Sequence, residues 1–385
     1  MPINLRFSKR TKIPAPASIA INALAKEKTQ KGEKIFNLSA GEPAITKDMS
    51  YPSPQGMIEL RHAAADWAKQ ELKTNFKPEN VLITAGGKYG LYLSILALIN
   101  DGDEVLIPSP YYVSYPQLVT LAGGKPVFVK TTQEKGWKLN IETAKKLCTK
   151  KTKLLIINNG SNPTGALYTD KEMKEIVNFA RKKNLWIISD EVYSGFVYDN
   201  LNYASIGKNE NAIIVHSMSK NFAMPGLRIG FVFASEEMIK TLTILQSQTL
   251  TGVSTINQKQ AINALKKSHK ITPKIRKEMQ KRRDTYIKTM WKYLRIKRPP
   301  PPAALYDLLP LSDLSPKDKS DDVKFCKTLL EKTGVALVPG SAFGAKGFVR
   351  IAFCAEKKDI KKGIKTLAKY LKTIGFASSN AHNCS

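Results

Sequence analysis

The stretch HSMSKNFAMPGLRIG, residues 216–230, is the strongest indication of the fold. A short apolar run rich in β-branched residues leads into it and predicts a buried strand over Ile213–His216. Lys220 stands in the polar turn that follows, and Arg228 comes eight positions later. In a chain with 61 lysines and arginines, one lysine is most simply a surface residue, so the neighbouring segments must decide whether Lys220 marks a site.

Two segments upstream have the same design, an apolar strand that ends in polar residues. WIISDEVYSGF ends its strand at Asp190 and continues to Tyr193, and NNGSNPTG places Asn162 in a turn after another strand. Ligands of parallel sheets bind at the carboxyl ends of the strands. We therefore expect these polar residues to meet Lys220 at one edge of a sheet.

The order of elements predicts an α/β fold. From about residue 80, short apolar runs alternate with helical patterns, which is typical of a mainly parallel sheet flanked by helices. The seven expected strands are Val81–Thr84, Glu104–Ile107, Pro126–Val129, Leu154–Ile157, Trp186–Ser189, Ile213–His216 and Ile229–Val232.

A charged and almost wholly helical region follows, from Ser235 to about Arg298, and ends at four consecutive prolines, Pro299–Pro302. Beyond it we expect a smaller α+β unit with strands near 304–309, 335–338 and 348–353 and helices near 321–333 and 357–372. The expected division is an N-terminal arm with part of the small domain (1–45), a large domain with the long connecting helix (46–298), a small domain (299–376) and a disordered tail (377–385).

Composition excludes several classes of protein. No apolar run approaches the ~20 residues of a membrane helix, and no secretory signal is recognisable, so we expect a cytoplasmic protein. The four cysteines are scattered without CxxC spacing, which disfavours a metal site and a disulfide framework. The net charge of +29 is spread over helical segments without a nucleic-acid-binding motif, and we expect no nucleic-acid partner.

The ordered set SNPTG, SDEVY, SxSKxFxxxGxRxG and VPGSAFG…VRIAF resembles the class I/II aminotransferases of pyridoxal-5′-phosphate (PLP) fold type I. The resemblance covers nearly the whole chain. It implies a large domain with a seven-stranded, mainly parallel sheet, a smaller α+β domain, and PLP as the cofactor. It also implies a homodimer with shared active sites.

The resemblance assigns chemical roles to the polar residues at the strand ends. Lys220 would form a Schiff base with PLP and then move a proton as general acid and base. Asp190 would keep the pyridine nitrogen protonated, and Asn162 and Tyr193 would donate hydrogen bonds to the phenolic oxygen. The candidate catalytic residues are therefore Lys220, Asp190 and Tyr193.

The cofactor phosphate needs backbone amides and fixed cations. TAGGKYG, residues 84–90, offers a glycine turn that opens a helix after a strand. By resemblance Tyr112 would stack on the cofactor ring, and Tyr51 would reach the phosphate of the neighbouring subunit. The candidate cofactor ligands are Tyr51, Gly86, Gly87, Lys88, Tyr112, Asn162, Asp190, Tyr193, Ser217, Lys220 and Arg228.

Arg350, in the apolar strand GFVRIAF, would bind the substrate α-carboxylate with its planar guanidinium. Lys88 opposes a helix dipole unless an anion lies nearby, and similar GGK segments in bacterial aspartate and prephenate aminotransferases bind a distal carboxylate. We therefore expect aspartate and 2-oxoglutarate as substrates. The candidate substrate contacts are Gly41, Lys88, Tyr112, Asn162 and Arg350.

Two departures from the family pattern stand out. The segment AITKDMS, residues 44–50, is short, as if a helix were missing, and PPPPAALYDLL replaces the usual glycine-containing PxGAFY. Alternatives also stay open at this point. A PLP-dependent C–S lyase or decarboxylase could use the same residues, and a non-enzymatic PLP-binding regulator or a degenerate structural relative is a further interpretation.

Overall fold

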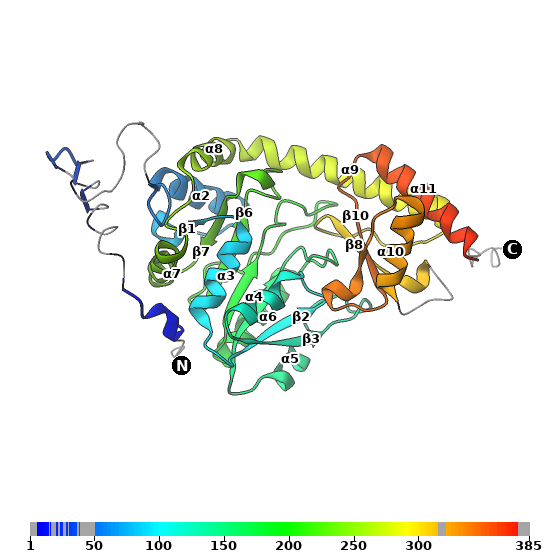
Figure 1. Ribbon diagram of the computed structural model, residues 1–385, viewed down its shortest axis with the longest axis horizontal. Helices are drawn as coiled ribbons and strands as arrows, with labels where there is room; N and C mark the ends of the chain where they lie inside the picture. The colour runs from blue at the N-terminus through cyan, green and yellow to red at the C-terminus, as the bar shows by residue number, and fades with distance from the viewer. Residues whose placement is uncertain are drawn as a thin grey trace.

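The structure is a computed structural model that describes residues 6–14, 16, 21, 24–25, 28–29, 31–36, 38, 51–314 and 321–375. Figure 1 shows a large sheet flanked by helices, a long helix α9 along one side, and a smaller group of strands and helices at its far end. Within the described residues, no helix has the length and apolar character needed to cross a membrane.

The large sheet has seven strands in the order β1-β7-β6-β5-β4-β2-β3. Only β7 runs against its neighbours, pairing antiparallel with both β1 and β6. Each strand overlaps a predicted one, so the expected α/β fold is confirmed. The strands are β1 (Val81–Thr84), β2 (Glu104–Ser109), β3 (Lys125–Lys130), β4 (Thr152–Asn158), β5 (Trp186–Asp190), β6 (Ala212–Ser217) and β7 (Gly230–Phe233).

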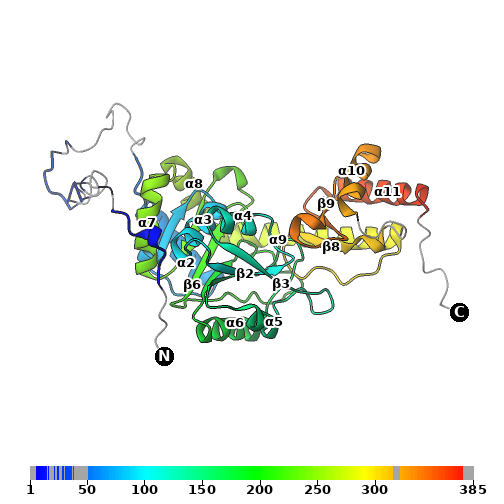
Figure 2. The same cartoon turned by 60° about the horizontal axis from the view of Figure 1, so that its bottom comes forward.

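Helices cover both faces of this sheet, because alternate strand residues point to opposite sides. On β5, for example, Ile187 packs in one apolar cluster and Ile188 in the other. Figure 2 shows α5 and α6 on one side of the sheet and α3 and α4 on the opposite side. The first face is packed by α2 (Ile58–Glu71), α5 (Ile141–Leu147), α6 (Asp170–Lys182) and α8 (Thr255–Lys266), and the second by α3 (Gly87–Leu98), α4 (Ser114–Leu121) and α7 (Glu236–Thr249).

The smaller unit is an antiparallel sheet of order β8-β10-β9, packed on helices. Helix α9 spans 27 residues, and its second half contributes Tyr286, Met290 and Leu294 to the apolar core of this unit. The elements are α9 (Ser268–Leu294), β8 (Tyr306–Pro310), α10 (Asp322–Thr333), β9 (Val338–Pro339), β10 (Phe348–Ala352) and α11 (Lys357–Thr373). Short 3₁₀ helices complete the chain at η1 (Lys9–Thr11), η2 (Pro78–Asn80), η3 (Pro225–Leu227), η4 (Leu311–Asp313) and η5 (Gly340–Phe343).

The strand expected at 335–338 is wrong for most of its length. β9 is a two-residue strand that begins at Val338, since only Val338 and Pro339 pair with β10. The strand expected from residue 304 begins two residues later, at Tyr306. Ala304 instead has a φ of +62° and donates its backbone N–H to the carbonyl of Phe196, which ties it to the large sheet's loops.

Several hydrogen bonds join the two sheets near the carboxyl ends of the strands. The Tyr111 N–H donates to the Phe343 carbonyl at 3.0 Å, and the Ser109 hydroxyl donates to the Gly344 carbonyl at 3.1 Å. These contacts join the end of β2 and the residues just after it to the segment just before β10. They bring the strand that carries Arg350 to the edge where the polar turns of the large sheet gather.

Candidate active site

The central strands of the large sheet end side by side in polar residues. Asn158 at the end of β4 is in register with Asp190 at the end of β5, and Ser217 is the last residue of β6. Because these strands are parallel, the turns that follow them leave the sheet at one edge. The structure therefore places the segments carrying Asn162, Tyr193 and Lys220 together, as the sequence predicts.

Asp190 is buried, with 5% of its surface exposed. Its Oδ2 accepts a hydrogen bond from the Tyr115 hydroxyl at 2.7 Å, and its Oδ1 has only a long contact of 3.4 Å from the Val192 N–H. Burial raises the pKa of Asp190 to about 6, although the hydrogen bonds and the charge of Lys220 oppose this rise. No ion pair of Asp190 is formed among the described residues, so a cationic N–H group would complement its carboxylate.

Lys220 lies in the turn after β6 and is half-buried. Its Nζ stands 5.7 Å from the centre of the Tyr193 ring, which brings two of the candidate catalytic residues together. The Tyr193 hydroxyl is 3.0 Å from that of Tyr306, and burial raises the pKa of Tyr193 well above its usual range. Tyr193 therefore keeps its proton at neutral pH and can act as a hydrogen-bond donor.

Arg350 lies on β10, opposite Leu308 of β8. Its Nη1 donates to Asn162 Oδ1 at 3.0 Å, and its guanidinium packs over the rings of Tyr306 and Phe343, at 4.4 and 4.7 Å from their centres. Its Nε is buried without a hydrogen-bond partner. Among the described residues no carboxylate forms an ion pair with Arg350, so this guanidinium can still bind an anion.

The turn between β1 and α3 forms a narrow glycine cradle with Arg228. Gly86 has a φ of +84°, and a Cβ at this position would lie 2.4 Å from Arg228 Nη2. At Gly87 a Cβ would meet Ser217 Cβ at 3.5 Å. The structure thus brings Gly86, Gly87, Ser217 and Arg228 together at the N-terminus of α3, where backbone N–H groups favour an anion.

Gly230 allows strand β7 to pack closely against the turn that forms this cradle. A Cβ at Gly230 would lie 2.4 Å from the carbonyl carbon of Gly86 and 2.6 Å from the nitrogen of Gly87. The antiparallel strand β7 therefore runs directly beneath the turn, and only a residue without a side chain permits this approach.

Lys88 and Tyr112 lie beside this cradle. Lys88 is exposed in the first turn of α3, and its Nζ stands 5.8 Å from the centre of the Tyr112 ring. The Tyr112 ring meets the edge of the Tyr115 ring, with the centres 5.4 Å apart and the planes at 81°. Tyr51 is 62% exposed, while Gly41 and the short segment 44–50 lie outside the described residues.

Three residues of this site were not identified from sequence. Tyr115 binds Asp190, while Tyr306 and Phe343 hold Arg350. The one available signal was the position of Tyr115, three residues after Tyr112 in the segment that follows β2. Tyr306 and Phe343 are ordinary apolar positions in the sequence, and only the contact between the two sheets shows their role.

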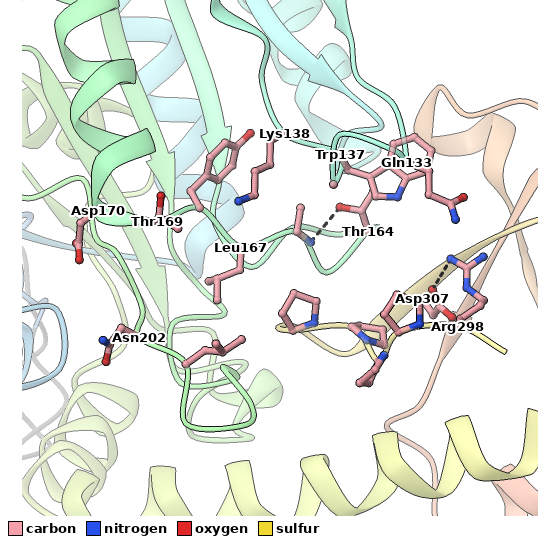
Figure 3. A pocket seen from close by; sticks show the side chains of 18 residues that line it. Gln133, Trp137, Lys138, Thr164, Leu167, Thr169, Asp170, Asn202, Arg298 and Asp307 are labelled. Atoms are coloured by element: carbon pink, nitrogen blue, oxygen red, sulfur yellow. Dashed lines mark hydrogen bonds and ion pairs between the residues drawn. The ribbon is translucent and has the colours of Figure 1, made fainter.

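A separate cavity of about 520 Å³ lies behind the loop that carries Asn162. Figure 3 shows Thr164 and Leu167 on one wall, with Arg298 and Asp307 on another. Most of the charges that line it have ion-pair partners, because Arg298 binds Asp307 at 3.2 Å across the lining and Lys138 binds Glu172, outside the lining, at 2.8 Å. None of the candidate catalytic residues lines this cavity, so it is distinct from the candidate active site.

Comparison with known proteins agrees with this geometry. The family model for aminotransferase class I and II matches residues 22–367. A protein of Aquifex aeolicus, named as a probable aspartate/prephenate aminotransferase, is 37% identical and aligns over 94% of this chain and 97% of its own length. The aspartate/prephenate aminotransferase of Thermus thermophilus is 33% identical, over 95% of this chain and 98% of its own length.

Solved structures give the same result. Aspartate aminotransferase from Thermus thermophilus with maleate superposes with a TM-score of 0.78 at 31% identity, covering 95% of this chain and all (100%) of that chain. The aromatic aminotransferase from Pyrococcus horikoshii superposes with a TM-score of 0.79 at 34% identity, covering 94% of each chain. The expected family and fold are thereby confirmed. This chain belongs to the class I and II aminotransferases and is an enzyme of that family.

Proposed function

We propose that this aminotransferase uses PLP, held on Lys220, to move an amino group from aspartate to 2-oxoglutarate. The observation that carries the proposal is Asp190, a buried carboxylate at the end of β5 that forms no ion pair among the described residues. A ring nitrogen that carries a proton would supply this missing cation. The glycine cradle formed by Gly86 and Gly87 fits a phosphate equally well, since a side chain at Gly86 would occupy the space in front of Arg228.

In this proposal PLP supplies the electron sink that makes the substrate Cα–H acidic. The chain's own residues bind, orient and transfer protons. Asp190 holds the proton on the ring nitrogen, and Arg350 binds the α-carboxylate of the substrate through two parallel N–H···O bonds. The Lys220 amine moves a proton to and from Cα as general acid and base. Tyr193 donates its hydroxyl hydrogen bond to the phenolic oxygen, together with the Asn162 amide.

Residues 46–298 form the proposed cofactor-binding domain, and residues 299–376 the proposed small domain, which supplies Arg350. The hydrogen bond between Asn162 and Arg350 would then break and re-form as the two units move. Arg350 and Asn162 already share one hydrogen bond at 3.0 Å, and a bound carboxylate would compete for the same Nη1.

The dicarboxylate substrate rests on Lys88. This lysine is exposed beside Tyr112 at the N-terminus of a helix that has no acidic residue in its first turn, which is unfavourable unless an anion binds there. Relatives named aspartate aminotransferase, one of them solved with maleate, a dicarboxylate, support this choice. The similarity to an aromatic aminotransferase makes phenylalanine the competing donor to test.

The test is amino transfer from aspartate, glutamate or phenylalanine, measured as the new amino acid formed. Lys88→Gln should reduce kcat/KM for aspartate by roughly 10- to 100-fold, because a charge-assisted hydrogen bond contributes about 1.5–3 kcal/mol. It should leave kcat/KM for phenylalanine unaffected. Lys240→Gln, which removes an exposed lysine from α7, is the control. If aspartate and glutamate are both inert in the unaltered enzyme, the dicarboxylate proposal is wrong.

The same assay separates the alternatives. A C–S lyase would release sulfide from cysteine or a thiol from cystathionine, and a decarboxylase would release carbon dioxide. A PLP-binding regulator would take up the cofactor without turning over any of these compounds. Each outcome is measured in the same samples.

We also propose a cytoplasmic homodimer with composite active sites, in which Tyr51 of one subunit reaches the phosphate in the other. Co-expression of Tyr51→Ala and Lys220→Ala chains tests it. In the mixed dimer, the subunit with an intact Lys220 would receive Tyr51 from its partner, so activity should return even though each variant alone is impaired. If mixing restores nothing although the mixed dimer forms, Tyr51 does not act across an interface.

A further inference from the structure

Tyr115 has the shortest hydrogen bond to the Asp190 side chain among the described residues. It is the second residue of α4 and is 2% exposed, and its hydroxyl donates to Asp190 Oδ2 at 2.7 Å. The two residues are 75 positions apart in the chain. Their contact is therefore made by tertiary packing of α4 against the end of β5.

This hydroxyl remains a donor over the whole working pH range. Burial raises the pKa of Tyr115 well above its ordinary value, and the adjacent Asp190 carboxylate raises it further. A protonated phenol that donates to a carboxylate stabilises the charged form of that carboxylate. Tyr115 therefore opposes the effect of burial, which pushes Asp190 toward its neutral form.

The hydrogen bond also orients the carboxylate. Oδ2 is occupied by Tyr115, whereas Oδ1 has only the 3.4 Å contact from the Val192 N–H. One oxygen is thus fixed and the other is left available for a further donor. A carboxylate free to rotate about its terminal bond would not present a single oxygen in this way.

Other titratable groups also act on Asp190. Lys220 favours its charged form, and the raised pKa of the neighbouring Glu191 is caused mainly by burial and in part by the Asp190 charge. Tyr193 and Tyr203 lie near enough for the Asp190 charge to raise the pKa of each hydroxyl, but neither forms a hydrogen bond with Asp190. Among the described residues Tyr115 is the side chain that donates a hydrogen bond to the carboxylate.

Tyr115 also links Asp190 to the aromatic ring beside the glycine cradle. Its backbone N–H donates to the Tyr112 carbonyl at 2.9 Å, and the two rings meet edge to face. A single turn of chain thus sets the position of the Tyr112 ring and the orientation of Asp190.

We propose that Tyr115 is a positioning residue that holds Asp190 charged and leaves its Oδ1 free for the cofactor's ring nitrogen. This inference rests on the proposed function, because it requires that Asp190 binds the ring nitrogen of PLP. It adds a second element to that site, a tyrosine that acts only through Asp190.

The chain offers a closely matched control. Tyr286 is 1% exposed and donates its hydroxyl to Asp307 Oδ2 at 2.9 Å, in the core of the small unit. Tyr286→Phe therefore deletes the same kind of buried Tyr–Asp hydrogen bond as Tyr115→Phe, at a position outside the candidate active site. A general loss of stability would affect both variants, whereas a role at Asp190 would affect only one.

The experiment measures the affinity of the full chain for pyridoxamine phosphate as a function of pH. This probe has the ring nitrogen and phosphate of PLP but no aldehyde, so it cannot react with Lys220. Affinity for the probe should fall at acid pH, where Asp190 becomes protonated. Tyr115→Phe should weaken binding about tenfold near neutral pH. It should also shift this acidic fall in affinity to higher pH, because Asp190 would be protonated more easily. Tyr286→Phe should leave both quantities unchanged.

A double-variant cycle tests whether Tyr115 acts through Asp190. In an Asp190→Asn background, Tyr115→Phe should have no further effect on binding of the probe. If Tyr115→Phe is unstable, a ring-fluorinated tyrosine at position 115 provides a second test. Its more acidic hydroxyl is a stronger donor, so the acidic fall in affinity should move to lower pH.

The outcomes separate the inference from the proposed function. The inference is overturned if Tyr115→Phe behaves like Tyr286→Phe, or if its effect persists in full in the Asp190→Asn background. The proposed function itself fails if the unaltered chain binds neither PLP nor pyridoxamine phosphate.

Discussion

The guanidinium of Arg350 donates a hydrogen bond to the side chain of Asn162 at 3.0 Å, although 188 positions separate the two residues. Arg350 lies on the small sheet, and Asn162 follows β4 of the large sheet. The contact therefore joins the residue proposed to bind the substrate carboxylate to one proposed to bind the cofactor. Substrate binding and the relative position of the two units are expected to be coupled through this pair.

Replacing Arg350 tests this coupling. Arg350→Lys keeps the charge but loses the planar fork and the packing over Tyr306 and Phe343, so KM for the amino acid should rise roughly 10- to 100-fold. Steady-state kinetics of amino transfer measure the change. Arg282→Lys, which alters an arginine bound to the Cys354 carbonyl, is the control and should retain normal KM. An unchanged KM in Arg350→Lys would rule out two parallel hydrogen bonds between Arg350 and the substrate α-carboxylate.

Gly230→Ala should be severely destabilising. Its Cβ would lie within 2.6 Å of backbone atoms of Gly86 and Gly87, so the turn or β7 must move, at a cost of about 3 kcal/mol or more. Because that turn forms the proposed phosphate cradle, affinity for PLP should fall as well. Gly226→Ala is the matched control, since a Cβ there meets no atom within 4 Å, and it should change stability by less than about 0.5 kcal/mol. Urea denaturation and cofactor titration measure both effects.

Glu191→Gln should make stability less dependent on pH. Glu191 is fully buried, and burial raises its pKa from 4.5 to about 7. The folded protein thus holds this proton more tightly than the unfolded chain does. The stability that protonated Glu191 contributes is therefore lost as pH rises from about 4.5 to about 7. The free energy of unfolding of Glu191→Gln, relative to wild type, should rise by about 2–3 kcal/mol between pH 5 and 8.

Denaturation of both proteins in the cofactor-free form measures this difference. Glu104→Gln is a control of opposite sign, because hydrogen bonds from Thr149 and Thr152 lower the pKa of Glu104. The stability of Glu104→Gln relative to wild type should fall as pH rises toward 4.5 and should stay nearly constant between pH 5 and 8. Parallel trends in the two variants would contradict the assignment for Glu191.

His216 should lower the free energy of unfolding as pH falls, which is opposite to the effect of Glu191. It is fully buried against Trp67, its Nδ1 accepts the Ser217 N–H at 2.8 Å, and burial lowers its pKa from 6.5 to about 3. The unfolded chain therefore binds this proton more readily, and the histidine removes about 2 kcal/mol of stability between pH 7 and 5. His216→Asn should be less stable at pH 7 but should lose about 2 kcal/mol less over this interval. Thermal denaturation at both pH values is the measurement, and an unchanged pH dependence would contradict a neutral buried His216.

Much of the fold could be predicted from local sequence. All seven strands of the large sheet were located, because each is a run of four to seven residues in which apolar side chains stand together between polar turns. β9 was largely missed, because it forms only two residues of pairing and its apolar neighbours Val335 and Leu337 pack into the small unit without joining the sheet.

The sequence by itself determined that polar residues end the central strands, that glycines open α3, and that Lys220 follows β6. These features are local, since they depend on residue type and spacing along one segment. The tertiary structure decided which of them touch. The strand order β1-β7-β6-β5-β4-β2-β3 puts Gly230 under the turn at Gly86, and packing of α4 on β5 gives Asp190 its partner Tyr115. Spacing along the chain cannot predict such contacts, because they arise when distant segments bury their apolar faces against one another.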